Sequence, residues 1–162
     1  AVGQNMESAK ARFEAALTVL NEHETVNPEH TAALGYCFGG SVVLNMARLG
    51  VDLDVVGSFH GGLGGVKAGD ASNVQGRVAI YNGASDPFVT QQQIDEVTQA
   101  LDSAQVDYQF INYPGVVHSF TNPGATKIGE QFQLPLRYDQ LADDSSWQHF
   151  QLLLRDTFNS EG

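Results

Sequence analysis

The segment Thr31-Ala-Ala-Leu-Gly-Tyr-Cys-Phe-Gly-Gly-Ser41 constrains the fold of this chain more than any other. Its first residues are small and apolar and predict a short buried strand, and the apolar residues that follow Ser41 predict a helix. Between them, a Gly-x-Cys-x-Gly sequence places Cys37 in a sharp turn from strand to helix, an arrangement known as a nucleophile elbow. The two glycines are expected to let the neighbouring backbone pass closely, and the helix N-terminus would favour a thiolate at Cys37.

This motif by itself has two interpretations. A lone cysteine in an apolar segment is more often an inert part of a core than a reactive group. The residues further along the chain therefore decide whether Cys37 is presented for chemistry or packed away.

The rest of the chain alternates between predicted helices and strands. A first helix over residues 7–23 is expected to bury one face at helical spacing, formed by Met6, Ala9, Phe13, Ala16, Leu17 and Leu20. Further strands are predicted at residues 53–59, 77–82 and 108–113. Further helices are predicted at residues 41–49, after a capping box formed by Thr90 and Gln93, and at residues 146–158. The last helix is expected to bury Trp147, Phe150, Leu153, Leu154 and Phe158. The polar stretch up to about residue 144 is left without a predicted helix or strand.

Strands that alternate with helices predict an α/β fold, a mainly parallel sheet flanked by helices on both faces. The length of 162 residues suits one domain over residues 1–162. A net charge of −11 argues against nucleic acid or an anionic membrane as partners. One cysteine excludes an internal disulfide and a cysteine-rich zinc site, and no metal site is expected. A reduced, cytoplasmic setting is the default expectation, because no apolar run approaches the length of a membrane span.

Three residues with complementary chemistry each follow a predicted strand: Cys37, Asp86 and His118. Functional residues of parallel sheets gather beyond the carboxyl ends of the strands, so we expect these three at one edge. Their order along the chain, nucleophile then acid then histidine, is that of the α/β-hydrolases. His118 could take the proton of Cys37, Asp86 could orient the imidazole, and the backbone N–H of Phe38 could stabilise an oxyanion.

Three segments together resemble the signature segments of the dienelactone hydrolase family. They are Gly35-Tyr-Cys-Phe-Gly-Gly40, Gly83-x-x-Asp-Pro-Phe88 and Val117-His-Ser-Phe-Thr-Asn-Pro123, and the stretch from Tyr138 to Trp147 is similar to the start of the family's closing helix. The resemblance implies an α/β-hydrolase fold and hydrolysis of enol-lactones and related esters without a cofactor. It also implies a thioester acyl-enzyme on Cys37, with His118 as base and acid and Asp86 as its carboxylate. Tyr36, His60, Phe88 and Phe120 are predicted to line the substrate pocket.

The chain departs from the family pattern in two places. Members that cleave dienelactone carry an arginine four positions beyond the histidine, where Asn122 stands here, so the expected substrates extend to different or neutral esters. The family also has strands before the first helix of this chain, which supply a second oxyanion donor. Without them, the strand that ends at Tyr36 would be an exposed sheet edge. We therefore expect a fragment of the family fold that lacks the N-terminal strands, or a sheet completed by a second chain or an exchanged segment.

Two other functions remain open from the sequence. Glutamine amidotransferases also place a cysteine in a Gly-x-Cys-x-Gly elbow, but they pair the histidine with a nearby glutamate. Alternatively, the chain is a truncated, non-catalytic remnant of the fold that binds a ligand or partner. An ester assay of the wild type against Cys37→Ala separates catalysis from binding.

Overall fold

The computed structural model describes residues 6–65 and 68–159. Within these ranges the elements follow in the order α1 (Met6–Asn21), β1 (Ala32–Tyr36), α2 (Phe38–Arg48), β2 (Val55–Phe59), β3 (Arg77–Gly83), α3 (Gln91–Ser103), β4 (Tyr108–Tyr113), α4 (Ala125–Phe132) and α5 (Gln140–Asn159). The alternation of strands and helices that the sequence predicted is confirmed.

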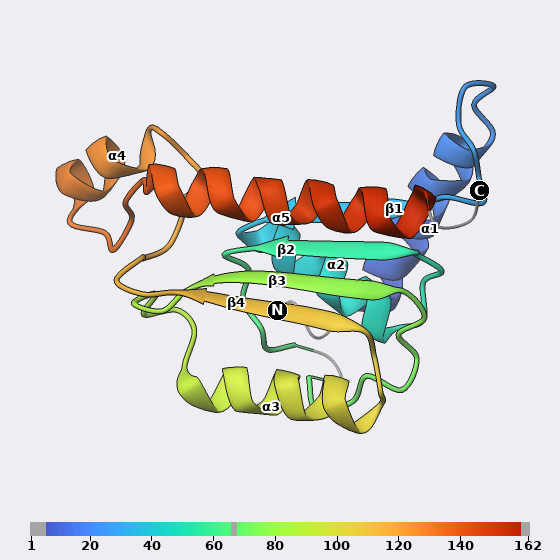
Figure 1. Cartoon of the computed structure of the whole chain (residues 1–162), viewed down its shortest axis with the longest axis horizontal. Coiled ribbons are helices and arrows are strands. Elements are labelled where there is room, and N and C mark those ends of the chain that lie inside the picture. Colours follow the sequence, from blue (N-terminus) through green and yellow to red (C-terminus); the bar gives the residue numbers. More distant parts are fainter. Residues whose placement is uncertain (1–5, 66–67, 160–162) are drawn as a thin grey trace.

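The strands of the described residues form one parallel sheet in the order β1-β2-β3-β4, so sequence neighbours are also spatial neighbours (Figure 1). The register aligns Tyr36 with Phe59, Phe59 with Tyr81, and Tyr81 with Ile111. Because all strands run in the same direction, their carboxyl ends meet at one edge, which lies toward α4 in Figure 1.

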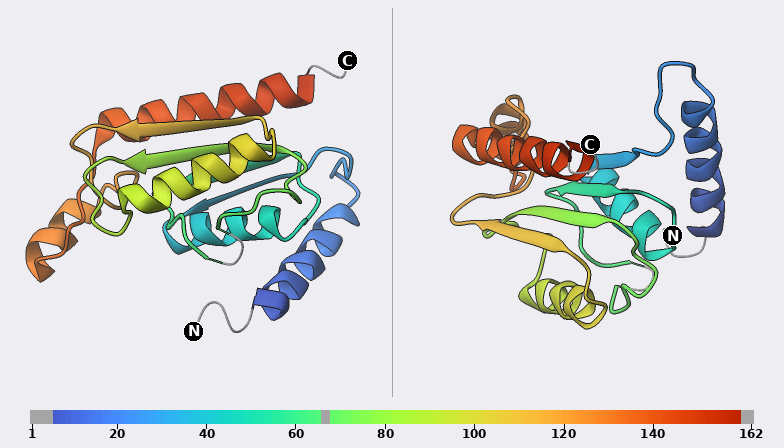
Figure 2. Two further views of the ribbon diagram at one scale, coloured as in Figure 1. Left: turned by 90° about the horizontal axis from the view of Figure 1, so that it is seen from below. Right: turned by 45° about the vertical axis from the view of Figure 1, so that its right-hand side comes forward.

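Helices cover both faces of this sheet, as Figure 2 shows, with α5 on one face and α1, α2 and α3 on the other. Side chains alternate along each strand, which divides the core into two parts. On β3, for example, Val78 and Ile80 pack toward α2 and α3, whereas Ala79 and Tyr81 pack toward α5 and its buried Phe150. This covered parallel sheet is the architecture that the sequence predicted.

The boundaries of several elements differ from the prediction. Helix α2 begins at Phe38, directly after Cys37, rather than at Ser41. Helix α5 begins at Gln140 rather than at 146, because the Asp139 carboxylate accepts the N–H of Ala142 at 3.0 Å and caps the first turn. The capping box at Thr90, whose hydroxyl accepts the N–H of Gln93, is present as predicted.

The expected burial is wrong for three residues, which lie on two helices. On α1, Ala9, Phe13 and Leu17 pack against the core, but Ala16 is exposed and Leu20 keeps 50% of its surface exposed. On α5, Trp147 is 41% exposed while Phe150 is fully buried. In both helices the apolar face is wider than the surface against which it packs in the described part of the chain.

Strand β1 forms one edge of the sheet, as expected. It pairs with β2 alone among the described strands. Leu34 and Tyr36 on this strand are exposed. An apolar edge strand of this kind has backbone groups that can pair with another strand.

Candidate active site

Cys37 lies in the turn between β1 and α2 with a backbone φ of 53°. A residue with a side chain rarely adopts this conformation, and it holds the cysteine above the end of the sheet. The backbone N–H of Cys37 lies 3.0 Å from the Phe59 carbonyl oxygen and 3.1 Å from Nδ1 of His60, both at the end of β2. The neighbouring strand therefore holds the elbow in place.

The glycines of the elbow have different roles. A Cβ on Gly35 would lie 2.2 Å from the carbonyl carbon of Gly39, so this position requires glycine. A Cβ on Gly39 would meet nothing within 4 Å, and the expectation that Gly39 is needed for close approach is wrong. Gly40 fills that role instead, because a Cβ there would lie 2.7 Å from Oγ of Ser58.

A continuous chain of hydrogen bonds joins the three sequence-predicted residues. Nε2 of His118 lies 3.1 Å from Sγ of Cys37, and Nδ1 of His118 lies 2.7 Å from Oδ2 of Asp86. The other carboxylate oxygen of Asp86 accepts the backbone N–H of Phe88 at 2.9 Å. The Asp86 side chain is fully buried and the Cys37 residue is exposed, so the chain runs from the interior to the surface.

The environment favours protonation of His118. Burial acts to lower the pKa of this imidazole, but the hydrogen bonds with Asp86 and with Cys37 outweigh burial and raise its pKa above the ordinary value. An imidazole with these two partners can accept a proton at Nε2 while its Nδ1–H remains bonded to the carboxylate.

A second histidine, His60, lies directly beside this chain. It is 3% exposed, and its ring packs edge-on against that of His118 at a centroid distance of 5.2 Å. Its Nε2 is 2.8 Å from Oγ1 of Thr121, and its Nδ1 accepts the Cys37 N–H, so Nε2 carries the proton. Burial, and then the nearby His118, lower the pKa of His60 to about 4, which keeps this ring neutral at physiological pH.

A cavity of about 390 Å³ opens beside the sulfur atom. Its described lining comprises Tyr36, Cys37, His60, Ser119, Thr121, Asn122, Pro123 and Asp143. Tyr36 and His60 are thus placed at the cavity, where the sequence put the pocket. Ser119, Thr121, Pro123 and Asp143 were not assigned to the pocket from the sequence. The first three lie within five positions after His118, which is a usable signal, whereas Asp143 comes from the distant α5.

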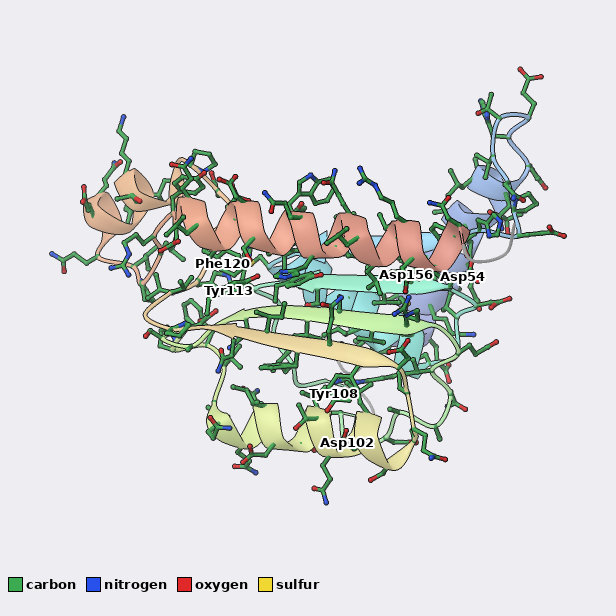
Figure 3. All side chains as sticks on the ribbon, viewed as in Figure 1. Asp54, Asp102, Tyr108, Tyr113, Phe120 and Asp156 are labelled. Carbon is green, nitrogen blue, oxygen red and sulfur yellow. The ribbon has the colours of Figure 1, made fainter. Side chains whose placement is uncertain are left out.

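The other two residues assigned to the pocket lie elsewhere. Phe88 is exposed and its ring lies perpendicular to that of His118 at a centroid distance of 5.2 Å, but it does not line the cavity. Phe120 differs from the expectation, because it has no exposed surface and packs in the core beneath the start of α5, against Tyr113 (Figure 3). In the loop after β4, Ser119 and Thr121 line the cavity, whereas Phe120 between them is buried in the core.

The remaining sequence-predicted group is the backbone N–H of Phe38. Phe38 is the first residue of α2, and the first N–H groups of a helix have no acceptor within it. This donor adjoins Cys37, where an oxyanion formed by attack of the sulfur would lie. Within the described residues, no group of three or more histidine, cysteine or acidic side chains is placed to hold a metal ion.

The chain matches the dienelactone hydrolase family over residues 1–158. It belongs to this family. A protein from Synechocystis, provisionally described as a carboxymethylenebutenolidase, is 30% identical over 119 residues, which are 67% of this chain and 47% of that protein. The protein K02A2.1 of Caenorhabditis elegans is 28% identical over 92% of this chain and 94% of its own length.

A solved structure extends the likeness to three dimensions. The dienelactone hydrolase-like promiscuous phosphotriesterase P91, from metagenomic libraries, superposes with a TM-score of 0.82 at 32% identity. The match covers 92% of this chain and 61% of P91. This chain therefore spans about half to three fifths of the length of the Synechocystis and P91 proteins, and it has the α/β-hydrolase fold of its family. No helix among the described residues is long and apolar enough to cross a membrane.

Proposed function

We propose that this protein hydrolyses carboxylic esters or lactones through Cys37, His118 and Asp86. The observation that carries the proposal is the unbroken chain from Sγ through the imidazole to a buried carboxylate, with distances of 3.1 and 2.7 Å. These residues lie on three separate loops, and membership of a hydrolase family agrees with the chemistry they can perform.

The reaction begins when Nε2 of His118 takes the proton of Cys37 and the sulfur attacks the carbonyl carbon of the ester. Negative charge develops on the carbonyl oxygen, close to the N–H of Phe38. When the carbonyl reforms, the C–O bond breaks, and His118 returns its proton to the departing alkoxide. The product of this half-reaction is an alcohol and a thioester on Cys37.

The second half-reaction repeats these steps with water. His118 takes a proton from the water, the resulting hydroxide attacks the thioester, and the acid leaves as the proton returns to sulfur. Throughout, Asp86 holds Nδ1–H of His118 and stabilises the imidazolium. The carboxylate bonded to His118 is an aspartate, which argues against the amidotransferase-like alternative. The lone cysteine at this site favours a reducing compartment such as the cytoplasm.

The test compares hydrolysis of 4-nitrophenyl acetate by the wild type and by Cys37→Ala. We expect the variant to lose at least about 100-fold in kcat/KM, the lower range for loss of an activated nucleophile. Acid quenching followed by mass spectrometry should find one acetyl group on the wild type and none on the variant. Equal rates in the two proteins would remove Cys37 from the mechanism and favour the non-catalytic alternative.

A further inference from the structure

The cavity beside Cys37 is unbalanced in charge. Asp143 contributes a carboxylate, and no lysine or arginine is present among the described lining residues. Ser119, Thr121 and Asn122 add hydroxyl and amide groups without charge. The lining thus offers acceptors and one negative charge, which suit a cation or a hydroxylated group better than a carboxylate.

Neighbouring side chains do not neutralise Asp143. Burial, offset in part by a hydrogen bond from Tyr138 and reinforced by the nearby Asp144, raises the pKa of the Asp143 carboxyl. The same carboxylate acts across the cavity, since burial and then Asp143 raise the pKa of Tyr36. His60 supplies no compensating charge, because its low pKa of about 4 leaves the ring neutral.

We propose that Asp143 determines the charge specificity of this site, which accepts esters with cationic or neutral hydroxylated groups and rejects those with a carboxylate beside the scissile bond. For ester turnover this rests on the proposed function. The charge selection itself concerns access to Cys37 and can be measured without turnover.

A purely structural role for Asp143 would predict a different result. Asp143 lies in the first turn of α5, where an acidic side chain stabilises the helix dipole. Its neighbour Asp144, the next residue of α5, is exposed and does not line the cavity. Asp143→Asn and Asp144→Asn remove one carboxylate each from adjacent positions of α5, so a difference in charge selectivity between them is not due to net charge, and urea unfolding of both variants shows any difference in stability.

The deciding experiment modifies Cys37, the only cysteine of the chain, with two thiol reagents of similar size and opposite charge. The cationic trimethylammonioethyl and the anionic sulfonatoethyl methanethiosulfonates each form a disulfide with the sulfur and release methanesulfinate. Intact mass follows the rates at low ionic strength, where screening is weak. The ratio of the cationic to the anionic rate is divided by the same ratio for the urea-unfolded chain, which removes the intrinsic difference in reactivity.

We expect the normalised ratio to exceed one in the wild type and in Asp144→Asn, and to fall by about fivefold or more in Asp143→Asn. The Asp143 carboxylate attracts the cationic reagent and repels the anionic one, and in a water-like dielectric the two effects together amount to about a fivefold difference in rate. An unchanged ratio in Asp143→Asn, or an equal fall in both variants, would overturn the proposal.

A second arm uses 4-nitrophenyl esters of pentanoate, glutarate and trimethylammoniobutanoate, which present a neutral, an anionic and a cationic acyl chain. Cys37-dependent hydrolysis of the cationic over the anionic ester, lost in Asp143→Asn, supports both proposals. Absence of hydrolysis with charge-selective thiol modification would refute the proposed function alone. Hydrolysis of all three esters with equal kcat/KM would refute the charge selection alone.

Discussion

His60 should make the stability of this protein depend on pH in a way that one substitution removes. The folded state holds the pKa of this buried ring at about 4, against an ordinary value of 6.5. As the pH falls below 6.5, His60 becomes protonated in the unfolded chain, whereas in the folded chain it becomes protonated only near pH 4. Stability from this residue is therefore complete above pH 6.5 and is lost as the pH falls toward 4.

The magnitude follows from the two pKa values. The full difference corresponds to about 3 kcal/mol at ~1.36 kcal/mol per pH unit, and about 2 kcal/mol of it is lost by pH 5. His60→Asn is the variant of choice, since its Oδ1 can accept the Cys37 N–H as Nδ1 does. Asparagine also tolerates the backbone φ of 41° at this position.

The measurement is urea unfolding followed by circular dichroism at pH 7.5 and pH 5. We expect the wild type to lose about 2 kcal/mol more than His60→Asn between the two pH values. His118 titrates in both proteins with a raised pKa and contributes stability that is retained at low pH, so its effect largely cancels in the comparison. His149→Asn, at an exposed position on α5, is the control and should behave as the wild type. An equal loss in wild type and His60→Asn would refute the reasoning.

Further predictions concern the carboxylate, the elbow and a helix cap. Asp86→Asn should lower kcat/KM by about 100- to 10,000-fold. It should also shift the acidic limb of the pH–rate profile to lower pH, because Asp86 raises the pKa of His118. Steady-state assays from pH 5 to 9 measure both effects, and an acidic limb at the same pH in variant and wild type would contradict the second. Gly35→Ala should destabilise the fold by about 2 kcal/mol or more, since its Cβ would overlap the Gly39 backbone, whereas Gly39→Ala should be neutral or stabilising by up to about 1 kcal/mol in urea unfolding. Thr90→Ala should cost about 1 kcal/mol by loss of the capping box, measured by thermal unfolding, with no effect on ester hydrolysis.

The strands and the three loops of the candidate site were predictable because strong local signals define them. Apolar runs ended by glycine or proline gave β2, β3 and β4 within two residues of their observed ends. Parallel pairing then requires the loops after β1, β3 and β4 to share one edge, and this brings Cys37, Asp86 and His118 together. Spacing along the chain was enough to predict that they meet.

The features that were missed depend on contacts between distant segments. Helix α4 has apolar residues at helical spacing, but it is only eight residues long, and its large apolar side chains Ile128 and Phe132 stay exposed while the small residues Ala125 and Gly129 are buried. Gly129 permits this packing because a Cβ there would lie 2.2 Å from the Leu136 carbonyl oxygen. The arrival of Asp143 at the cavity depends on where α5 begins.

The two residues that would exchange a proton come from opposite borders of the sheet. Cys37 follows β1 and His118 follows β4, with the two inner strands between them. The 3.1 Å distance between Sγ of Cys37 and Nε2 of His118 therefore depends on the twist and spacing of both strands that lie between them. If the proposed hydrolysis depends on this contact, its rate should report small changes anywhere in the sheet. Mild heating or a destabilised edge strand should then lower the rate before circular dichroism detects unfolding.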